Sequence, residues 1–216
     1  MLTTLIFDID LTLVNTLDAC LEGTNLLAKE FNLEKKTSKE VQAAISLPLE
    51  SFWHAMWGKI EPEWYDFYIE KILPNINLFG PLYPGVLDIL KEARDREILL
   101  AISTNRYHPW LDLAKIGIAH LFDTAVGPDQ NIRPKPEPDI PQLILKQLGS
   151  NPSTTIYVGD STFDMLAANA SGIKAMGLTQ GGTSEKDLFA AGAWLVKPSI
   201  LDVRELLDPS RGFLAI

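Results

Sequence analysis

The chain has little of several features that direct proteins to particular classes. It contains one cysteine, Cys20, so it cannot form an intramolecular disulfide, and no CxxC or Cys/His cluster offers a zinc site. Its formal net charge is −9 and no run of Lys and Arg is present, which argues against a surface for nucleic acid or anionic membrane. We therefore expect a reducing compartment, the cytoplasm.

Long hydrophobic runs are also missing. The N-terminal stretch MLTTLIFDIDLTLV has no basic residue and carries two aspartates, so we expect neither a signal peptide nor a membrane span. Hydrophobic residues make up 46% and charged residues 22% of the 216 residues, which is typical of a globular protein. This composition fits an enzyme as well as a binding protein, and it leaves the oligomeric state open.

Short aliphatic runs alternate with helical patterns through the C-terminal two-thirds of the chain. We expect strands at 98–103, 155–158, 173–177 and 193–196, and helices at 85–96, 109–116, 139–148, 162–170 and 184–190. Ser161 and Ser184 are suited to cap helices, and Gly149, Gly172 and Gly192 to follow helix ends. The alternation predicts an α/β fold with a parallel sheet.

A first strand at residues 4–8 is followed by a gap of roughly ninety residues, far longer than a strand–helix connection needs. Residues 16–80 show only helical periodicity. We therefore expect an α/β core from 1–15 and 81–216, with a helical subdomain from 16–80. The aromatic residues between 52 and 68 either line a pocket over a substrate or form the core of that helical bundle.

Polar residues interrupt the apolar N-terminal run. Residues 7–13 read FDIDLTL, so on an extended chain Asp8, Asp10 and Thr12 would point to one side. This pattern also suits an amphipathic strand with a solvated face. Two aspartates so close together repel each other, however, unless a cation or a proton lies between them. A bound metal would explain the pair.

Two later strands also end in polar residues. One runs into Ser-Thr-Asn-Arg at 103–106, and the other into a segment that contains Asp160 and Asp164. The carboxyl ends of parallel strands meet at one edge of a sheet, where ligands bind. Taken singly, the two aspartates could be a turn residue and a helix first-turn acid. Lys135, among the prolines of RPKPEPD, is a candidate charge for a phosphate or a solvated loop lysine.

The combination of DxDxT, a strand ending in Thr-Asn, a KPxPD segment and GDSxxD resembles the haloacid dehalogenase-like (HAD) hydrolase superfamily, particularly its phosphoglycolate-phosphatase-like branch. The resemblance implies a Rossmann-like three-layer core with an inserted helical cap, Mg²⁺ as cofactor and a small phosphorylated metabolite as substrate. It implies that Asp8 is the nucleophile, that Asp10 is its acid/base partner, and that Lys135 neutralises the phosphoryl group.

The same resemblance implies a metal site and a substrate site. Mg²⁺ would lie between the side chain of Asp8, the backbone carbonyl of Asp10 and the side chain of Asp160, with Asp164 in support. Carboxylate oxygens suit Mg²⁺ rather than zinc, and a cation is needed before a carboxylate can attack an anionic phosphoryl group.

Residues 104–106 are the expected substrate-binding segment. Thr104 would hydrogen-bond the transferring phosphoryl group, and Asn105 follows it. Arg106 could bind a carboxylate or a second phosphate of the substrate, with a surface salt bridge as the alternative.

The sequence departs from the family pattern at Leu11, where a glycine is usual, and this reduces backbone freedom beside Asp10. Asp10 itself favours phosphoryl transfer over dehalogenation, and the lack of a histidine in residues 17–21 favours hydrolysis over a phosphomutase reaction. A receiver or non-catalytic binding module is the remaining alternative. Such a module would need neither the helical insertion nor the second aspartate.

Overall fold

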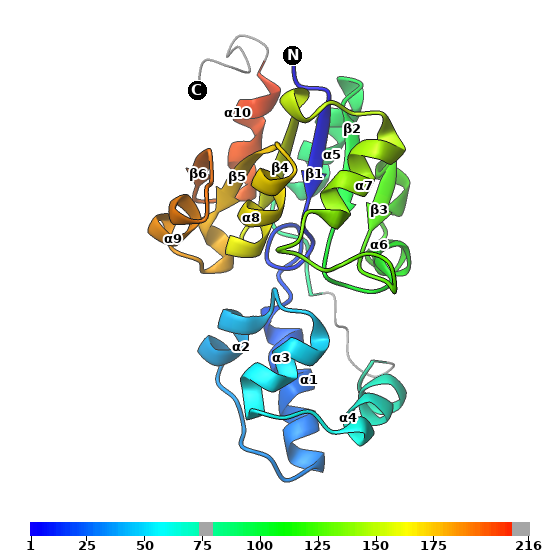
Figure 1. The fold of residues 1–216 in the computed structure, drawn as a ribbon, viewed down its shortest axis with the longest axis vertical. Helices are drawn as coiled ribbons and strands as arrows, with labels where there is room; N and C mark the ends of the chain where they lie inside the picture. The colour runs from blue at the N-terminus through cyan, green and yellow to red at the C-terminus, as the bar shows by residue number, and fades with distance from the viewer. Residues whose placement is uncertain (74–79, 209–216) are drawn as a thin grey trace. The chain divides into compact units, whose positions relative to one another are not determined.

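The computed structural model describes residues 1–73 and 80–208. Its central feature is a parallel sheet whose strands follow the order β3-β2-β1-β4-β5-β6 (Figure 1). The strands are β1 (Thr4–Phe7), β2 (Leu99–Ser103), β3 (Thr124–Val126), β4 (Thr155–Gly159), β5 (Lys174–Leu178) and β6 (Leu195–Lys197). The order places β1 in the middle, between β2 and β4, with Phe7 level with Ile102 and Val158.

Helices cover both faces of this sheet. They are α5 (Val86–Asp95), α6 (Pro109–Ile116), α7 (Asp139–Leu148), α8 (Thr162–Ala170), α9 (Glu185–Ala190) and α10 (Arg204–Leu207). Helices α7 and α8 lie in front of the sheet in Figure 1, and α5 lies behind it and packs against β2. The predicted three-layer α/β core with a parallel sheet is confirmed.

The central strands are buried on both faces because their residues are almost all apolar. Ile6, Ala101 and Tyr157 are level with one another across three strands and pack under Ile140 of α7 and Met165 of α8. All five are less than 1% exposed. Strands with this double burial read as continuous hydrophobic runs, which is why they were visible in the sequence.

Most element boundaries agree with the sequence prediction, and the helix-capping residues behave as expected. The Ser161 and Ser184 side chains accept hydrogen bonds from backbone N–H groups three residues on. Gly149, Gly172 and Gly192 follow helix ends with φ of 63°, 73° and 95°. The prediction missed β3, because three residues, Thr-Ala-Val, are too few to show a periodic pattern.

The chain folds into two compact units. Met1–Leu13 and the residues from Leu82 onward form the α/β unit, and Val14–Pro81 form the other. The second unit contains α1 (Leu17–Glu30), α2 (Ser38–Ala44), α3 (Leu49–Trp57), α4 (Pro62–Phe67) and a π-helical segment, Tyr68–Ile72. Residues 74–79, which the sequence also assigns to the helical subdomain, lie outside the described residues.

The aromatic residues of the helical unit pack on one another. Trp53 is 2% exposed and Trp64 is 1% exposed, and their rings meet edge to face with centroids 6.2 Å apart. Trp57 also packs edge to face on Trp64, with centroids 5.3 Å apart. This packing agrees with the interpretation of the aromatic stripe as a bundle core.

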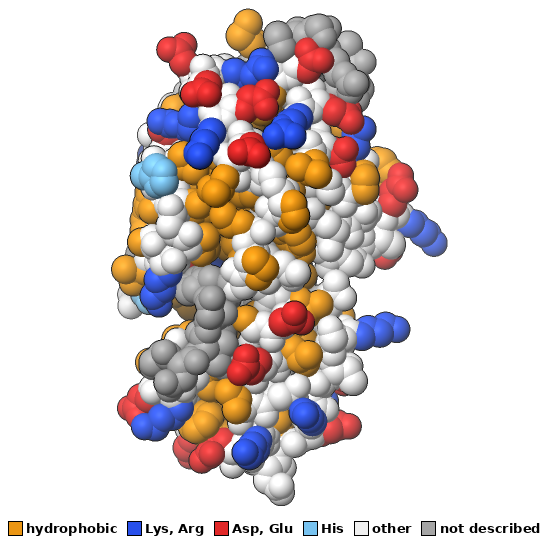
Figure 2. All heavy atoms as spheres, turned by 180° about the vertical axis from the view of Figure 1, so that it is seen from behind, with side chains coloured by type: hydrophobic (Ala, Val, Ile, Leu, Met, Phe, Trp, Pro, Cys, Tyr) orange, Lys and Arg blue, Asp and Glu red, His pale blue; other side chains and the backbone are white. Residues whose placement is uncertain are grey.

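Figure 2 shows one face of the molecule, on which acidic and basic side chains are interspersed and hydrophobic side chains gather in places. Among the described residues, no helix combines the length and apolar character needed to cross a membrane.

Candidate active site

The candidate site lies at the carboxyl end of the central strands. Strand β1 has β2 on one side and β4 on the other, so the order of the sheet reverses at β1. In open α/β sheets this reversal opens a crevice outside the strand ends, where ligands bind. Asp8 follows β1, Thr104 follows β2, and Asp160 follows β4. Three of the predicted site residues therefore share one edge of the sheet.

The strand predicted at 4–8 ends at Phe7, and the segment after it is not extended, so the alternative interpretation of residues 7–13 as an amphipathic strand is wrong. The chain turns instead, with the Leu13 N–H donating to the Ile9 carbonyl at 3.0 Å. Leu11 has φ of 56°, in the left-handed region. The turn still buries Ile9, Leu11 and Leu13, each at most 1% exposed, so the apolar alternation reflects burial of a turn rather than a strand.

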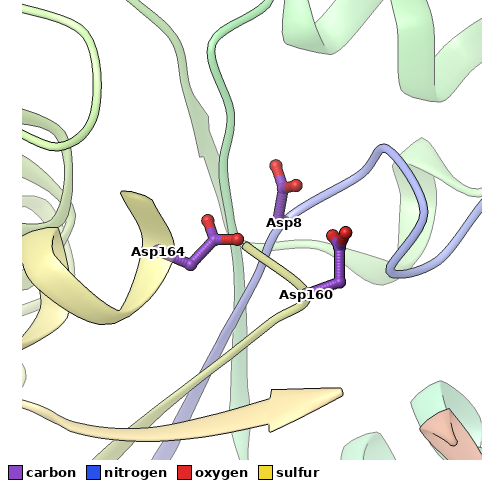
Figure 3. Close-up of side chains that lie close together, drawn as sticks. All are labelled: Asp8, Asp160 and Asp164. Atoms are coloured by element: carbon purple, nitrogen blue, oxygen red, sulfur yellow. The ribbon is translucent and has the colours of Figure 1, made fainter. Parts of the chain in front are cut away.

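Three buried carboxylates converge at the strand ends. Asp8, Asp160 and Asp164 each offer an oxygen, and these oxygens lie within 4.8 Å of one another. Figure 3 shows the three side chains pointing toward a common space from the end of β1, the end of β4 and the first turn of α8. Asp10 is not a member of this cluster.

Lys135 supplies the positive charge of the site. Its Nζ donates to Asp8 Oδ1 at 2.9 Å, to Asp164 Oδ1 at 2.7 Å and to the Ser103 carbonyl at 3.0 Å. The side chain is 3% exposed, so it is not a solvated loop lysine. Asn105 holds the lysine in place, because its amide accepts from the Lys135 N–H at 2.8 Å and donates to the Lys135 carbonyl at 3.2 Å.

Asp164 is already surrounded by donors. Lys135 and the Tyr157 hydroxyl contact its Oδ1, and the backbone N–H and hydroxyl of Ser161 contact its Oδ2. By contrast, Oδ2 of Asp8 and Oδ2 of Asp160 accept no hydrogen bond from the residues that the structure describes. Asp164 is therefore better placed to orient its neighbours than to bind a ligand directly.

Two residues that contact the carboxylate cluster, Tyr157 and Thr12, had no role assigned to them from the sequence. Tyr157 projects its hydroxyl into the site from inside β4, 2.9 Å from Asp164 Oδ1, and Thr12 donates to Asp160 Oδ1 at 2.8 Å. The tyrosine had a usable signal, because a phenol within an otherwise aliphatic buried strand needs a hydrogen-bond partner. Thr12 belongs to the DxDxT pattern, but its contact with Asp160 was not predictable, since the turn that brings the two together is not visible in the sequence.

Burial sets the electrostatics of the cluster. It raises the pKa of Asp8 from 3.8 to about 7, although Lys135 opposes the shift. It also raises the pKa of Asp160 well above its ordinary value, with the charges of Asp164 and Asp8 adding to the effect. Burial alone would lower the pKa of Lys135, but Asp164 and Asp8 raise it well above its usual range. The lysine is charged, and it does not by itself keep all three carboxylates ionised.

The donor set fits a hard divalent cation. Three ionised carboxylates and one ammonium would leave a net charge of −2 in a buried space, which a divalent cation would cancel. Asp8 and Asp160 offer the oxygens for it, and an all-oxygen set suits Mg²⁺ better than softer metals.

Asp10 and Arg106 form an ion pair beside the cluster. Arg106 donates from Nε to Asp10 Oδ2 at 2.7 Å and from Nη2 to Asp10 Oδ1 at 2.6 Å. Its Nη1 lies 3.6 Å from Asp112 Oδ2. Thr104 is 1% exposed, and its hydroxyl accepts from the Arg106 N–H at 3.2 Å. In residues 104–106, which follow β2, Asn105 therefore contacts Lys135 and Arg106 contacts Asp10.

The chain is similar to several known proteins. "Probable phosphatase IndB" of Dickeya dadantii is 28% identical over 209 residues, covering 92% of this chain and 90% of that protein. A phosphoglycolate phosphatase of Haemophilus influenzae is 31% identical over 192 residues, covering 81% of this chain and 84% of its own length. The crystal structure of a predicted phosphoglycolate phosphatase from Haemophilus somnus matches with a TM-score of 0.83 and 23% identity, over 96% of this chain and 98% of that one.

The family model described as haloacid dehalogenase-like hydrolase matches residues 5–178, which include every residue of the site described above. The chain therefore belongs to the haloacid dehalogenase-like hydrolase family.

Proposed function

We propose that the protein is a Mg²⁺-dependent phosphatase that hydrolyses small phosphate monoesters through an aspartyl-phosphate on Asp8. The observation that carries the proposal is the position of the Asp8 carboxylate. It lies at the sheet reversal, 2.9 Å from the Lys135 ammonium and within a cluster of three buried carboxylates. The names of the relatives, a probable phosphatase and a phosphoglycolate phosphatase, support the same substrate class. We propose residues 16–80 as the helical cap of this enzyme.

The reaction has two steps. An oxygen of Asp8 attacks phosphorus, the bond between phosphorus and the ester oxygen breaks, and Asp10 gives its proton to the leaving alcohol. A water molecule then attacks the phosphorus of the aspartyl-phosphate, Asp10 takes a proton from it, and the bond to Asp8 breaks. The sum is ester plus water giving alcohol plus inorganic phosphate, with Asp8 and Asp10 restored.

Charge compensation makes the first step feasible. Lys135 lies against the nucleophile and is placed to offset the negative charge of the phosphoryl group. Mg²⁺ held by Asp8, Asp160 and the backbone carbonyl of Asp10 would supply the remaining positive charge that lets a carboxylate approach an anionic phosphate. Asp164 orients Lys135 through its Oδ1 and Ser161 through its Oδ2.

The nucleophile assignment is tested by Asp8→Asn. We expect steady release of phosphate from p-nitrophenyl phosphate by the unaltered chain with Mg²⁺, loss of that release with a chelator, and no turnover by the variant. Asp95→Asn, a matched change at an exposed aspartate of α5, should behave like the unaltered chain. Turnover by Asp8→Asn comparable with the control would exclude Asp8 as nucleophile.

The two alternatives give different results in the same assay. A phosphomutase would convert a sugar phosphate into its isomer faster than it releases phosphate. A receiver or binding module would accept phosphate at most once per chain and show no steady release. We expect neither. Residues 17–21 contain no histidine, which disfavours a phosphomutase, and Asp10 lies two residues from Asp8, where it can assist hydrolysis of the aspartyl-phosphate as a receiver would not.

A further inference from the structure

Arg106 binds the Asp10 carboxylate, which the proposed mechanism requires to be free to act as the acid/base. Its Nε and Nη2 contact both oxygens of Asp10, at 2.7 and 2.6 Å, in the parallel two-bond arrangement that guanidinium groups make with carboxylates. While this ion pair is intact, each Asp10 oxygen accepts a hydrogen bond from the guanidinium and cannot contact the oxygen of a leaving group. Asp10 therefore has to be released from Arg106 before it can serve the ester.

An anion is the group that can release it. The face of a guanidinium fork that binds a carboxylate binds any planar or tetrahedral oxyanion in the same way. The side chains of Arg106 and Asp10 are 20% and 13% exposed, so an anion from solvent can approach this pair. The Lys135–Asp164 pair, with side chains 3% and 0% exposed, is closed to solvent. Arg106 also faces Asp112 at 3.6 Å. The guanidinium therefore keeps one carboxylate partner, Asp112, when Asp10 leaves it.

We propose that Arg106 determines specificity by binding a second anionic group of the substrate, a carboxylate or a second phosphate, and that this anion takes the place of Asp10 on the guanidinium. The inference rests on the proposed function and narrows its substrate class. Asp10 lies two residues from the nucleophile Asp8, so the two anionic groups of the substrate must be close together. The preferred ester is small and carries both a phosphate and a nearby oxyanion.

The test compares matched esters that differ only in the second anion. For a carboxylate, the pair is 2-phosphoglycolate and 2-hydroxyethyl phosphate; for a phosphate, it is 1,3-propanediol bisphosphate and 3-hydroxypropyl phosphate. We expect the unaltered chain with Mg²⁺ to have the higher kcat/KM for the ester with the second anion in one of the two pairs. That pair identifies the second anionic group as a carboxylate or a phosphate. In Arg106→Ala the ratio of kcat/KM within that pair should fall by about tenfold or more, because the second anion loses its partner and Asp10 no longer has to be released for either ester.

Further variants separate recognition from positioning. Arg106→Lys keeps the charge but loses the fork, so its ratio should fall as well, and it decides the matter if Arg106→Ala does not fold. Arg204→Ala removes an arginine whose side chain is 48% exposed and should keep the ratio of the unaltered chain. If Arg106 only positioned Asp10, both esters would lose rate equally and the ratio would not move.

Two other outcomes would overturn the inference, and they differ in whether the phosphatase proposal survives. No preference for the anionic member in the unaltered chain, or a preference that persists in Arg106→Ala and Arg106→Lys, overturns the inference and leaves the phosphatase proposal standing. No turnover of any of the four esters by the unaltered chain overturns the phosphatase proposal, and the inference with it.

Discussion

Leu11 occupies a backbone conformation that suits a residue without a side chain. Its φ of 56° costs a β-carbon-bearing residue about 1 kcal/mol or more, and glycine nothing. The side chain is 1% exposed, however, and a fully buried leucine contributes about 2 kcal/mol or more. Burial outweighs the backbone cost. The chain therefore keeps the turn beside Asp10 although the glycine usual for the family is replaced.

Two substitutions at Leu11 separate these contributions. Leu11→Ala and Leu11→Gly both remove the buried side chain, so both should lower the free energy of unfolding. Glycine relieves the left-handed strain, so Leu11→Gly should be more stable than Leu11→Ala by about 1 kcal/mol. Urea unfolding measures the difference. At an ordinary position alanine is the more stable of the two, and finding that order here would mean that the turn is not strained.

At the scale of elements, the 3₁₀ turn Thr179–Gly181 after β5 supports the site from outside the strand ends. The Gln180 Nε2 donates to the Leu11 and Thr12 carbonyls at 3.2 and 2.9 Å, and its Oε1 accepts from the Ile200 N–H at 2.8 Å. Gly181 lies so close to Asp160 that a β-carbon there would be 2.0 Å from Asp160 Oδ2. The turn thus binds the loop after β1 and lies directly beside one proposed metal ligand.

Gly181→Ala should therefore weaken Mg²⁺ binding. The added methyl group must displace the Asp160 carboxylate, and changes next to a metal ligand typically cost about 10- to 100-fold in affinity. Calorimetric titration with Mg²⁺ measures the effect without relying on turnover. Gly117→Ala is the control, because its β-carbon meets nothing within 4 Å although its φ of 85° is strained. Equal Mg²⁺ affinity in the two variants would show that Asp160 does not bind the metal.

For the whole molecule, the buried carboxylates link stability to pH and to metal. The pKa of Asp8 is about 7 in the folded protein, against an ordinary value of 3.8. Between these values the folded chain binds more protons than the unfolded chain, so stability falls as pH rises from about 4 to about 7. Asp160 shifts in the same direction. A divalent cation would replace the missing protons and reverse the loss.

The melting temperature should show this linkage. Without metal, we expect the contribution of the cluster to make the protein less stable at pH 8 than at pH 5. Excess Mg²⁺ should raise the melting temperature more at pH 8, where protons no longer compete for the carboxylates. In Asp8→Asn the difference between the two pH values should shrink, because one of the two shifted carboxyl groups is gone. An equal effect of Mg²⁺ at both pH values would contradict a metal bound by Asp8 and Asp160.

Apart from β3 and α10, the order of strands and helices in the α/β unit was available from the sequence because these signals are local. Aliphatic runs such as 98–103, capping residues such as Ser161 and the glycines after helices each report on their own neighbourhood. The same holds for the candidate residues at strand ends, since the ends of parallel strands share an edge. The roles of Asp8, Asp10, Asp160 and Lys135 came from their pattern and stay predictions until the experiments above are done.

The sequence by itself determined the α/β class, the parallel sheet and the set of acidic residues at strand ends, because each follows from residue type and spacing. Only the tertiary structure decided the contacts. It turned the chain at Leu11, placed Tyr157 and Thr12 in the site, and paired Arg106 with Asp10. The contacts of Thr12 with Asp160 and of Arg106 with Asp10 join residues far apart in the chain, whose distances depend on the packing of the whole sheet.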